Sequence, residues 1–545
     1  MIYRFHFLSK QKYFTASIFI LYVLLYFLFY GRYGWNDTDE GFILASSWRI
    51  FNGQVPYKDF ILIYPPLSYL AHSLTFYIIP DNYQIIFERL LFYVSLAESS
   101  YFAATTIEYL FRISKSGLDK FILATVGFVL SVHSFPPMPW YTVDGIFFGS
   151  IGIYLIVRYD YISTEIAGIL FLFLSALCKQ PFYIMPFAGL FYILVKHKNI
   201  KRALFSGFTL IILLSVLILI LIKYDILNQF IQYTTGSTNL KDLIKAGIYP
   251  YWRFDSAYFV TPLILGVLLV KLSSIYNQNL WIKLIPAIFI SILLLYNIPS
   301  FITGLHNNRI PVIYSDSVAR ILFILTFFYV LINFTSEIKW SALFFLILLS
   351  WCAGISWGYP TPVFFSTPLI AGFFLVAKQY FRFGSLKKLI YYVLILSTIV
   401  YYIGYQVPMR DSPRKELTYK LDKIFPKMKY IRTDNETFQK YSNLKELYEK
   451  YPVNFKTMPG MVLSNYLTNT IPPLAIDLVI DNGVKNINDV LIPSYEEKKP
   501  VLFIEKSPVL FTIDNPNAKW RSSFTFWAMN NLVKIDSNQY FNVYK

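Results

Sequence analysis

The sequence is poor in charge, cysteine and histidine. Only 15% of its 545 residues are charged, whereas an ordinary soluble protein has roughly 25%. The two cysteines, Cys178 and Cys352, both lie within apolar runs, where a thiol usually packs as a small hydrophobic group. The five histidines form no His-x-x-His or Glu-x-x-His spacing. The sequence therefore indicates neither a disulfide framework nor a histidine-rich metal site.

Apolar sequence is abundant instead. Hydrophobic residues make up 56% of the chain and aromatic residues 19%, and the mean hydropathy is +0.47. Many apolar runs are long enough to cross about 30 Å of hydrocarbon. The net charge is +17, much of which the positive-inside rule and anionic lipids explain, and no nucleic-acid recognition motif is present. We therefore predict an integral protein of the inner or plasma membrane.

The charges of the loops predict the topology. The run 14–30 follows three basic residues and has no small-residue cleavage site, so we expect a retained first span with a cytoplasmic N-terminus. The run 61–79 has no basic cluster after it; the first such cluster follows the run 90–110. We therefore expect 61–79 to lie along the outer interface or to form a re-entrant helix. Residues 32–88 then form one large external loop.

Two domains follow from this count. Residues 1–405 are expected to form a mainly α, polytopic membrane domain of about 13 transmembrane helices. Residues 406–545 are richer in charge, proline and asparagine and have no spanning run, so we expect a small α/β or α+β extracytoplasmic domain. Within it we predict an amphipathic helix at 436–450 and strands at 474–480, 501–504 and 540–544.

Three carboxylates follow the first span, in Asn36-Asp37-Thr38-Asp39-Glu40-Gly41. Acidic residues beside a bilayer are costly, so they indicate a functional site. A transferase that uses a lipid-phosphate sugar needs a carboxylate base for the acceptor hydroxyl. Its phosphate leaving group needs a cation instead of a second acid. We expect Asp39 to be the base, with Glu40 beside it. The alternative is that Asp37 or Asp39 only caps a helix at 40–51.

Further candidates lie at the boundaries of the spans. Asp144 is a second external carboxylate, for which the alternative is an N-cap of the next span. Lys179 interrupts two apolar runs, where a lysine deep in the bilayer costs roughly 2.5–3.5 kcal/mol. We expect it to bind the donor phosphate, and snorkelling to the headgroups is the alternative. Arg49, Arg253 and Arg309 are rival cations.

Several of these motifs resemble a known family, the bacterial family-39-like membrane glycosyltransferases of the GT-C superfamily, which are similar to dolichyl-phosphate-mannose-protein mannosyltransferases. The matching motifs of the first external loop are Asp39-Glu40-Gly41, Arg49, Gly53, Pro56-Tyr57-Lys58-Asp59-Phe60 and Tyr64-Pro65-Pro66-Leu67. Arg89, Asp144 and Lys179-Gln180 also fall where this pattern would put them. The resemblance covers most of residues 15–195 and, thinly, the C-terminal tail.

The resemblance implies inverting transfer of a sugar from a polyprenyl-phosphate donor to a hydroxyl of a cell-envelope acceptor (glycan, lipid or protein) on the external face. It implies that Asp39-Glu40 supplies the base, that Asp144 supports the site, and that Asp59, Tyr64 and Gln180 bind substrate. It implies no certain cofactor and leaves a divalent metal open.

Two departures from the pattern bear on the acceptor. Glu40 is followed by Gly-Phe-Ile, where the branch that acts on lipid A has Ala-Arg-Tyr. Tyr64 stands where protein O-mannosyltransferases have histidine. Neither lipid A nor protein is therefore favoured as the acceptor.

Two other functions compete with this one. A transporter or flippase of lipid-linked sugar would favour repeated halves with broken helices, and the sequence has no such symmetry. An O-antigen polymerase or ligase would usually have its functional loop late among the spans, whereas here the acidic residues follow the first span. The sequence therefore favours the transferase.

Overall fold

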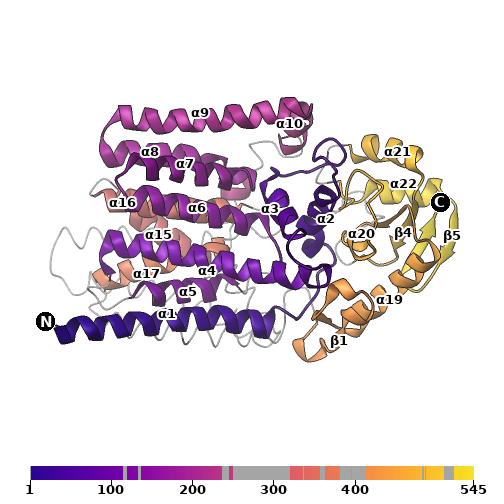
Figure 1. Cartoon of the computed structure of the whole chain (residues 1–545), viewed down its shortest axis with the longest axis horizontal. Coiled ribbons are helices and arrows are strands. Elements are labelled where there is room, and N and C mark those ends of the chain that lie inside the picture. Colours follow the sequence, from indigo (N-terminus) through magenta and orange to yellow (C-terminus); the bar gives the residue numbers. More distant parts are fainter. Residues whose placement is uncertain are drawn as a thin grey trace.

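The structure is a computed structural model, and it is mainly helical with a small sheet region near the C-terminus (Figure 1). It describes residues 2–113, 119–132, 137–235, 245–248, 319–334, 337–355, 362–380, 395, 412–481, 484, 486–508 and 521–545.

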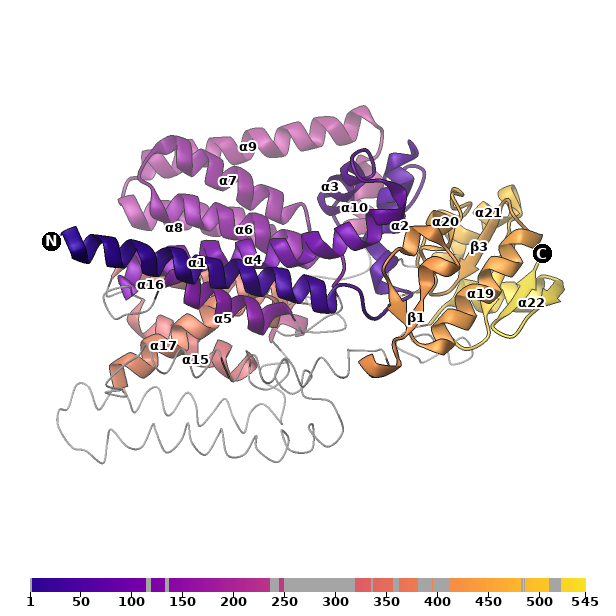
Figure 2. The same ribbon diagram turned by 60° about the horizontal axis from the view of Figure 1, so that its bottom comes forward.

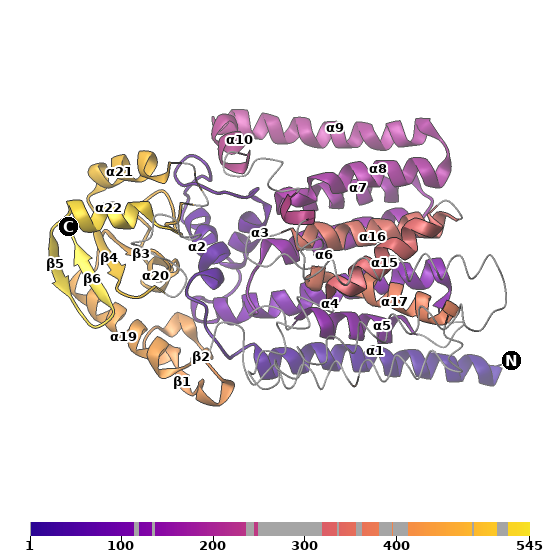
Figure 3. The same ribbon diagram turned by 180° about the vertical axis from the view of Figure 1, so that it is seen from behind.

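Long helices lie side by side in a bundle that makes up the N-terminal part of the molecule (Figures 1 and 3). Its helices are α1 (Ile2–Tyr30), α4 (Gln84–Phe111), α5 (Lys120–Val132), α6 (Tyr141–Arg158), α7 (Ile162–Ala176), α8 (Ile184–His197), α9 (Ile200–Lys223), α15 (Ala319–Asn333), α16 (Ile338–Gly354) and α17 (Thr367–Tyr380). On α9, large apolar side chains such as Ile211 and Leu219 face outward and are 59% and 64% exposed. An outward apolar face of this kind suits contact with lipid.

Three of the described helices are long and apolar enough to cross a membrane, namely 13–30, 141–158 and 200–223. Other apolar helices in the described part, among them α5, α7 and α16, are shorter. The same loop-charge argument predicts an inside loop at 271–283 and a last span near 389–404. Both lie outside the described residues, apart from residue 395. The described helices thus agree with a membrane protein, while the count of about 13 spans stays a prediction.

Two short helices follow α1 and lie between the bundle and the C-terminal region (Figure 2). They are α2 (Asp39–Phe51) and α3 (Leu67–Thr75). With nine residues, α3 is about 14 Å long and is too short to cross the hydrocarbon. Residues 61–66 are not helical; the Ile61 N–H donates to the carbonyl of Ala475 at 2.8 Å. The segment 61–79 is thus not one continuous helix, and it does not span.

The C-terminal region contains a four-stranded sheet in the order β3-β4-β6-β5, in which β3 and β4 are parallel and the other neighbours are antiparallel. Its strands are β3 (Phe455–Met458), β4 (Val501–Glu505), β5 (Lys534–Ser537) and β6 (Phe541–Tyr544), and a separate small sheet pairs β1 (Tyr419–Lys420) with β2 (Arg432–Thr433). The helices of this region are α19 (Asn435–Lys450), α20 (Ser464–Leu467), α21 (Ile487–Lys498) and α22 (Ser523–Asn531).

Most of the predicted elements of this region are confirmed. The helix at 436–450 and the strands at 501–504 and 540–544 agree with α19, β4 and β6 to within one residue at each end. The strand predicted at 474–480 is wrong, because the carbonyls of Leu474 and Ala475 accept hydrogen bonds from Arg49 and Ile61 instead of joining a sheet.

The first loop shares a hydrophobic core with the C-terminal region. Trp35 and the α2 residues Leu44 and Trp48 are buried in one cluster with Tyr441 and Phe455. The indole N–H of Trp35 donates to the Tyr441 hydroxyl at 2.6 Å. The C-terminal region is therefore packed directly against the helix that begins at Asp39.

Candidate active site

Thr38 is the N-cap of α2 and makes no side-chain capping hydrogen bond. The side-chain oxygen of Asn36 accepts hydrogen bonds from the N–H groups of Thr38 and Asp39 at 3.1 and 2.8 Å, and its amide nitrogen lies 3.3 Å from a carboxylate oxygen of Asp39. The expected alternative, capping by Asp37 or Asp39, is therefore wrong. The Asn36 side chain instead satisfies the N–H of Asp39, one of the free N–H groups at the start of the helix.

Asp37 ties the loop to the C-terminal region. Its carboxylate accepts hydrogen bonds from Lys440 at 2.6 Å and from the Tyr441 hydroxyl at 2.9 Å. Lys440 also lies 2.6 Å from Glu505. One lysine thus joins two carboxylates from distant parts of the chain. Burial would lower the pKa of Lys440, but Asp37 and Glu505 raise it well above its ordinary value.

Glu40 faces the bundle. Its side chain is 0% exposed, and its two oxygens each lie 2.6 Å from a nitrogen of Arg89. Arg89 also donates to the carbonyls of Gly31 and Gly34. Burial raises the pKa of Glu40, and the guanidinium opposes the shift. Although Glu40 is the neighbour of Asp39, it holds the loop in place and has no exposed oxygen with which to act as a base.

Asp39 lies beside a group of aromatic rings. Burial raises the pKa of Tyr64, the Tyr141 hydroxyl lowers it, and the nearby carboxylate of Asp39 raises it further. The Tyr64 and Tyr141 rings are 4.2 Å apart between centroids, and the Phe42 ring lies 5.9 Å from each. Asp39 is half-buried at the start of α2 and is near enough to the hydroxyls of Tyr64 and Tyr141 to interact electrostatically with both.

Lys179 and Gln180 join the same group from the loop after α7. The Lys179 side chain is 3% exposed. Its amine donates to the Thr142 hydroxyl at 3.1 Å and to the carbonyl of Ile355 at 2.9 Å, and it lies 5.1 Å from the centre of the Tyr141 ring. Both acceptors are neutral, and burial lowers the pKa of the Lys179 amine to about 7.

Gln180 supports the strand-like segment before α3. Its amide nitrogen donates to the carbonyls of Ile63 and Thr234 at 2.7 and 3.1 Å. The carbonyl of Tyr64 accepts a hydrogen bond from the Tyr57 hydroxyl at 2.7 Å. The backbone on both sides of the Tyr64 ring is thus held by side chains, which fixes the ring next to Tyr141.

Asp144 lies one turn beyond Tyr141 on α6 and contacts a histidine. One of its oxygens is 3.3 Å from Nε2 of His72, and Nδ1 of His72 is 2.5 Å from Glu88. Neither His72 nor Glu88 was among the residues expected at the site. His72 is 16 residues from Glu88 and 72 residues from Asp144 in the sequence. Neither separation matches a motif spacing, so the sequence offered no local signal for these contacts.

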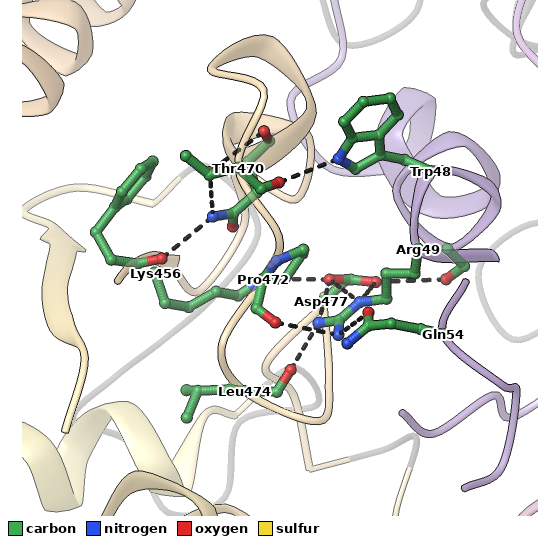
Figure 4. Close-up of polar contacts among 11 residues, drawn as sticks. Trp48, Arg49, Gln54, Lys456, Thr470, Pro472, Leu474 and Asp477 are labelled. Carbon is green, nitrogen blue, oxygen red and sulfur yellow. Dashed lines mark hydrogen bonds and ion pairs between the residues drawn. The ribbon is translucent and has the colours of Figure 1, made fainter. Parts of the chain in front are cut away.

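Arg49 is not available to a donor phosphate, which corrects the expectation for it. Its side chain is 1% exposed, and its N–H groups donate to Asp477, to the side chain of Gln54 and to the carbonyls of Pro472 and Leu474 (Figure 4). All five N–H groups of the guanidinium are therefore used.

The remaining candidates lie elsewhere. Asp59 is exposed, and its carboxylate closes its own turn by accepting the N–H of Val55 at 2.6 Å, so it does not join the aromatic group. Arg253 and Arg309 lie outside the described residues. The structure thus brings Asp39, Tyr64, Asp144, Lys179 and Gln180 into one region. Glu40, Arg49 and Asp59 are bonded to other partners.

The arrangement combines a half-buried carboxylate, a buried amine with neutral acceptors, tyrosine hydroxyls and a second carboxylate in contact with a histidine. Among the described residues, no group of three or more His, Cys, Asp or Glu side chains is placed to hold a metal ion. No family model matches the chain, and no curated protein matches it.

Proposed function

We propose that the protein is a membrane glycosyltransferase of the GT-C type, which transfers a sugar with inversion from a polyprenyl-phosphate donor to a hydroxyl of a cell-envelope acceptor. The observation that carries the proposal is the joint position of Asp39 and Lys179 around the Tyr64–Tyr141 pair. A base and a cation are the two groups that this reaction requires.

In the proposed reaction, the acceptor hydroxyl attacks the anomeric carbon and gives its proton to Asp39. The new carbon–oxygen bond forms as the bond from the anomeric carbon to the phosphate oxygen breaks, with inversion. The polyprenyl phosphate leaves as an anion, and Lys179 donates an N–H to it. Because phosphate leaves as a stable anion, no acid has to protonate it, and Glu40 is free to hold the loop.

An apolar cavity supports a lipid-linked donor. It has a volume of about 310 Å³ and lies between α15 and α16. Its lining includes Phe323, Phe327, Phe344, Leu348 and Trp351. A cavity without charged groups within a helical bundle suits an isoprenyl chain, whose binding depends on apolar contact.

The proposal includes the membrane arrangement. Residues 1–405 would form the transmembrane catalytic domain with a cytoplasmic N-terminus, and residues 406–545 an extracytoplasmic domain. The first loop would then face the outside, where Asp39 meets the acceptor. The acceptor stays open among glycan, lipid and protein.

Asp39→Asn tests the proposal, because it keeps the shape of the side chain and removes the base. Purified variant and wild type receive a radiolabelled polyprenyl-phosphate sugar and cell-envelope extract. We expect transfer to fall by about 10²- to 10⁴-fold. Asp225→Asn is the matched control, since Asp225 is exposed after α9, and it should transfer at the wild-type rate. Undiminished transfer by Asp39→Asn would remove Asp39 from the role of base.

A further inference from the structure

His72 is held between two carboxylates that come from different helices. Nδ1 of His72 lies 2.5 Å from Glu88 on α4, and Nε2 lies 3.3 Å from Asp144 on α6. The side chains of His72 and Glu88 are 8% and 0% exposed, while that of Asp144 is 15% exposed. The ring therefore connects a buried carboxylate with one at the edge of the site.

The hydrogen bonds define the charge of the ring. A neutral imidazole has one N–H, whereas both nitrogens of His72 face acceptors, so only the imidazolium can donate to both. The second oxygen of Glu88 accepts from the Thr75 hydroxyl at 2.6 Å and from the Gln84 amide at 2.9 Å. With an imidazolium at His72, Glu88 accepts hydrogen bonds at both oxygens, and a buried carboxylate needs a cation beside it.

The charged groups that face the ring are Glu88 from α4 and Asp144 from α6. The other polar neighbours of the cluster, Thr75 on α3 and Gln84 on α4, are neutral. Burial would lower the pKa of His72, but the two carboxylates raise it well above its ordinary value.

We propose that His72 is a positioning residue that carries a positive charge at neutral pH and orients the carboxylate of Asp144 toward the site. Asp144 has one oxygen in contact with the ring, and its other oxygen can accept a hydrogen bond from a hydroxyl of the substrate. The effect on transfer rests on the proposed function, whereas the charge and the contacts of His72 do not.

Nuclear magnetic resonance tests the charge independently of any activity. With ¹⁵N-labelled histidine in the full-length protein, the His72 signal is the one lost in His72→Gln or, if that variant does not fold, in His72→Lys. We expect both ring nitrogens to be protonated at pH 7.5 in the wild type and one to lose its proton in Glu88→Gln. A neutral His72 in the wild type at pH 7.5 would overturn the inference, whatever reaction the protein performs.

Transfer kinetics test the positioning role. We expect His72→Gln to lower kcat by about 10- to 100-fold, as when a group that orients a functional ligand is removed, with little change in KM for the donor. His72→Lys keeps a cation, so it should recover most of kcat and move the alkaline limb of the pH profile upward. Equal losses in both variants, or an unchanged pH profile in His72→Gln, would contradict the role.

His197 provides a matched control. It lies 2.7 Å from Glu165 at the opposite end of the bundle, so His197→Gln removes a similar pair without touching the site and should leave kcat and the pH profile unchanged. If the wild type transfers no sugar, the proposed function fails, and the resonance experiment still decides the charge of His72.

Discussion

Arg49 and Asp477 form a buried ion pair across 428 residues of sequence, with Nε and Nη2 of the arginine 2.8–3.0 Å from the carboxylate oxygens. Lys456 lies 3.4 Å from the same carboxylate. The pair joins the helix that begins at Asp39 to the C-terminal region. The position of the proposed base therefore depends on residues that follow the helical bundle in the sequence.

Asp477→Asn should destabilise the protein by about 3–5 kcal/mol, because it leaves Arg49 buried without a counter-charge. Thermal unfolding in detergent measures the effect, and protease sensitivity of the C-terminal region should rise with it. Lys450→Met removes an ion pair with Asp536 in which the lysine is 60% exposed, so it should change stability little. Similar effects of the two substitutions would contradict the role of Arg49–Asp477.

The same carboxylate predicts a dependence of stability on acid. Burial would raise the pKa of Asp477, but Arg49 and Lys456 lower it below its ordinary value. The stabilisation is therefore complete above about pH 4, the pKa of an unfolded aspartate, and it is lost as the pH falls through the lower folded-state value. Between pH 6 and pH 3, the unfolding temperature of the wild type should approach that of Asp477→Asn. A constant difference between the two unfolding temperatures over this pH range would contradict the prediction.

Substitutions at Asp39 and Glu40 should have different effects, one on activity and the other on stability. Glu40→Gln breaks the buried pair with Arg89, so we expect a loss of about 3–5 kcal/mol. Asp39→Asn should keep wild-type stability and lose transfer. Unfolding curves and transfer rates of the same preparations make the comparison. A stable but inactive Glu40→Gln would assign the chemistry to Glu40 instead.

The membrane arrangement can be tested with thiol labelling. Cys178 and Cys352 are both free and buried, so they should give little background. In intact cells, a membrane-impermeant reagent should label Lys58→Cys, which lies exposed in the first loop. Tyr161→Cys lies at the opposite end of the bundle, where the tyrosine is 71% exposed, and should react only after permeabilisation. The reverse pattern would place the first loop in the cytoplasm.

Local patterns in the sequence were sufficient for part of this architecture. Hydrophobic runs predicted the spans at 14–30 and 90–110, which lie within α1 and α4, and turn residues bounded β4 and β6. The cost of charge near a bilayer pointed to Asp39, Asp144 and Lys179, which the structure places in one neighbourhood. These inferences rest on neighbours in sequence or on the side of the membrane that a loop occupies.

The pairing of distant charges could not be predicted in this way. Arg49 carries the charge that a phosphate needs, and nothing near it in the sequence shows that Asp477 takes up that charge. His72 and Glu88 are likewise ordinary residues of a loop and a helix until α3 folds against α4 and α6. Residue type and spacing describe what a side chain can bind, while the tertiary fold decides which partner it has.

The tie between Asp37 and Lys440 has a consequence for biogenesis. The two residues are 403 positions apart, so at roughly 5–20 residues per second a ribosome makes the lysine about 20–80 s after the aspartate. In the proposed membrane arrangement, the first loop would already be outside during that interval, while Asp37 and Arg49 lack their partners. The site of a nascent chain would therefore be incomplete. The proposed sugar transfer would begin only after translation has passed Glu505, which contacts Lys440. Nonsense mutations late in the gene would then abolish the proposed transfer without removing the helices of the bundle.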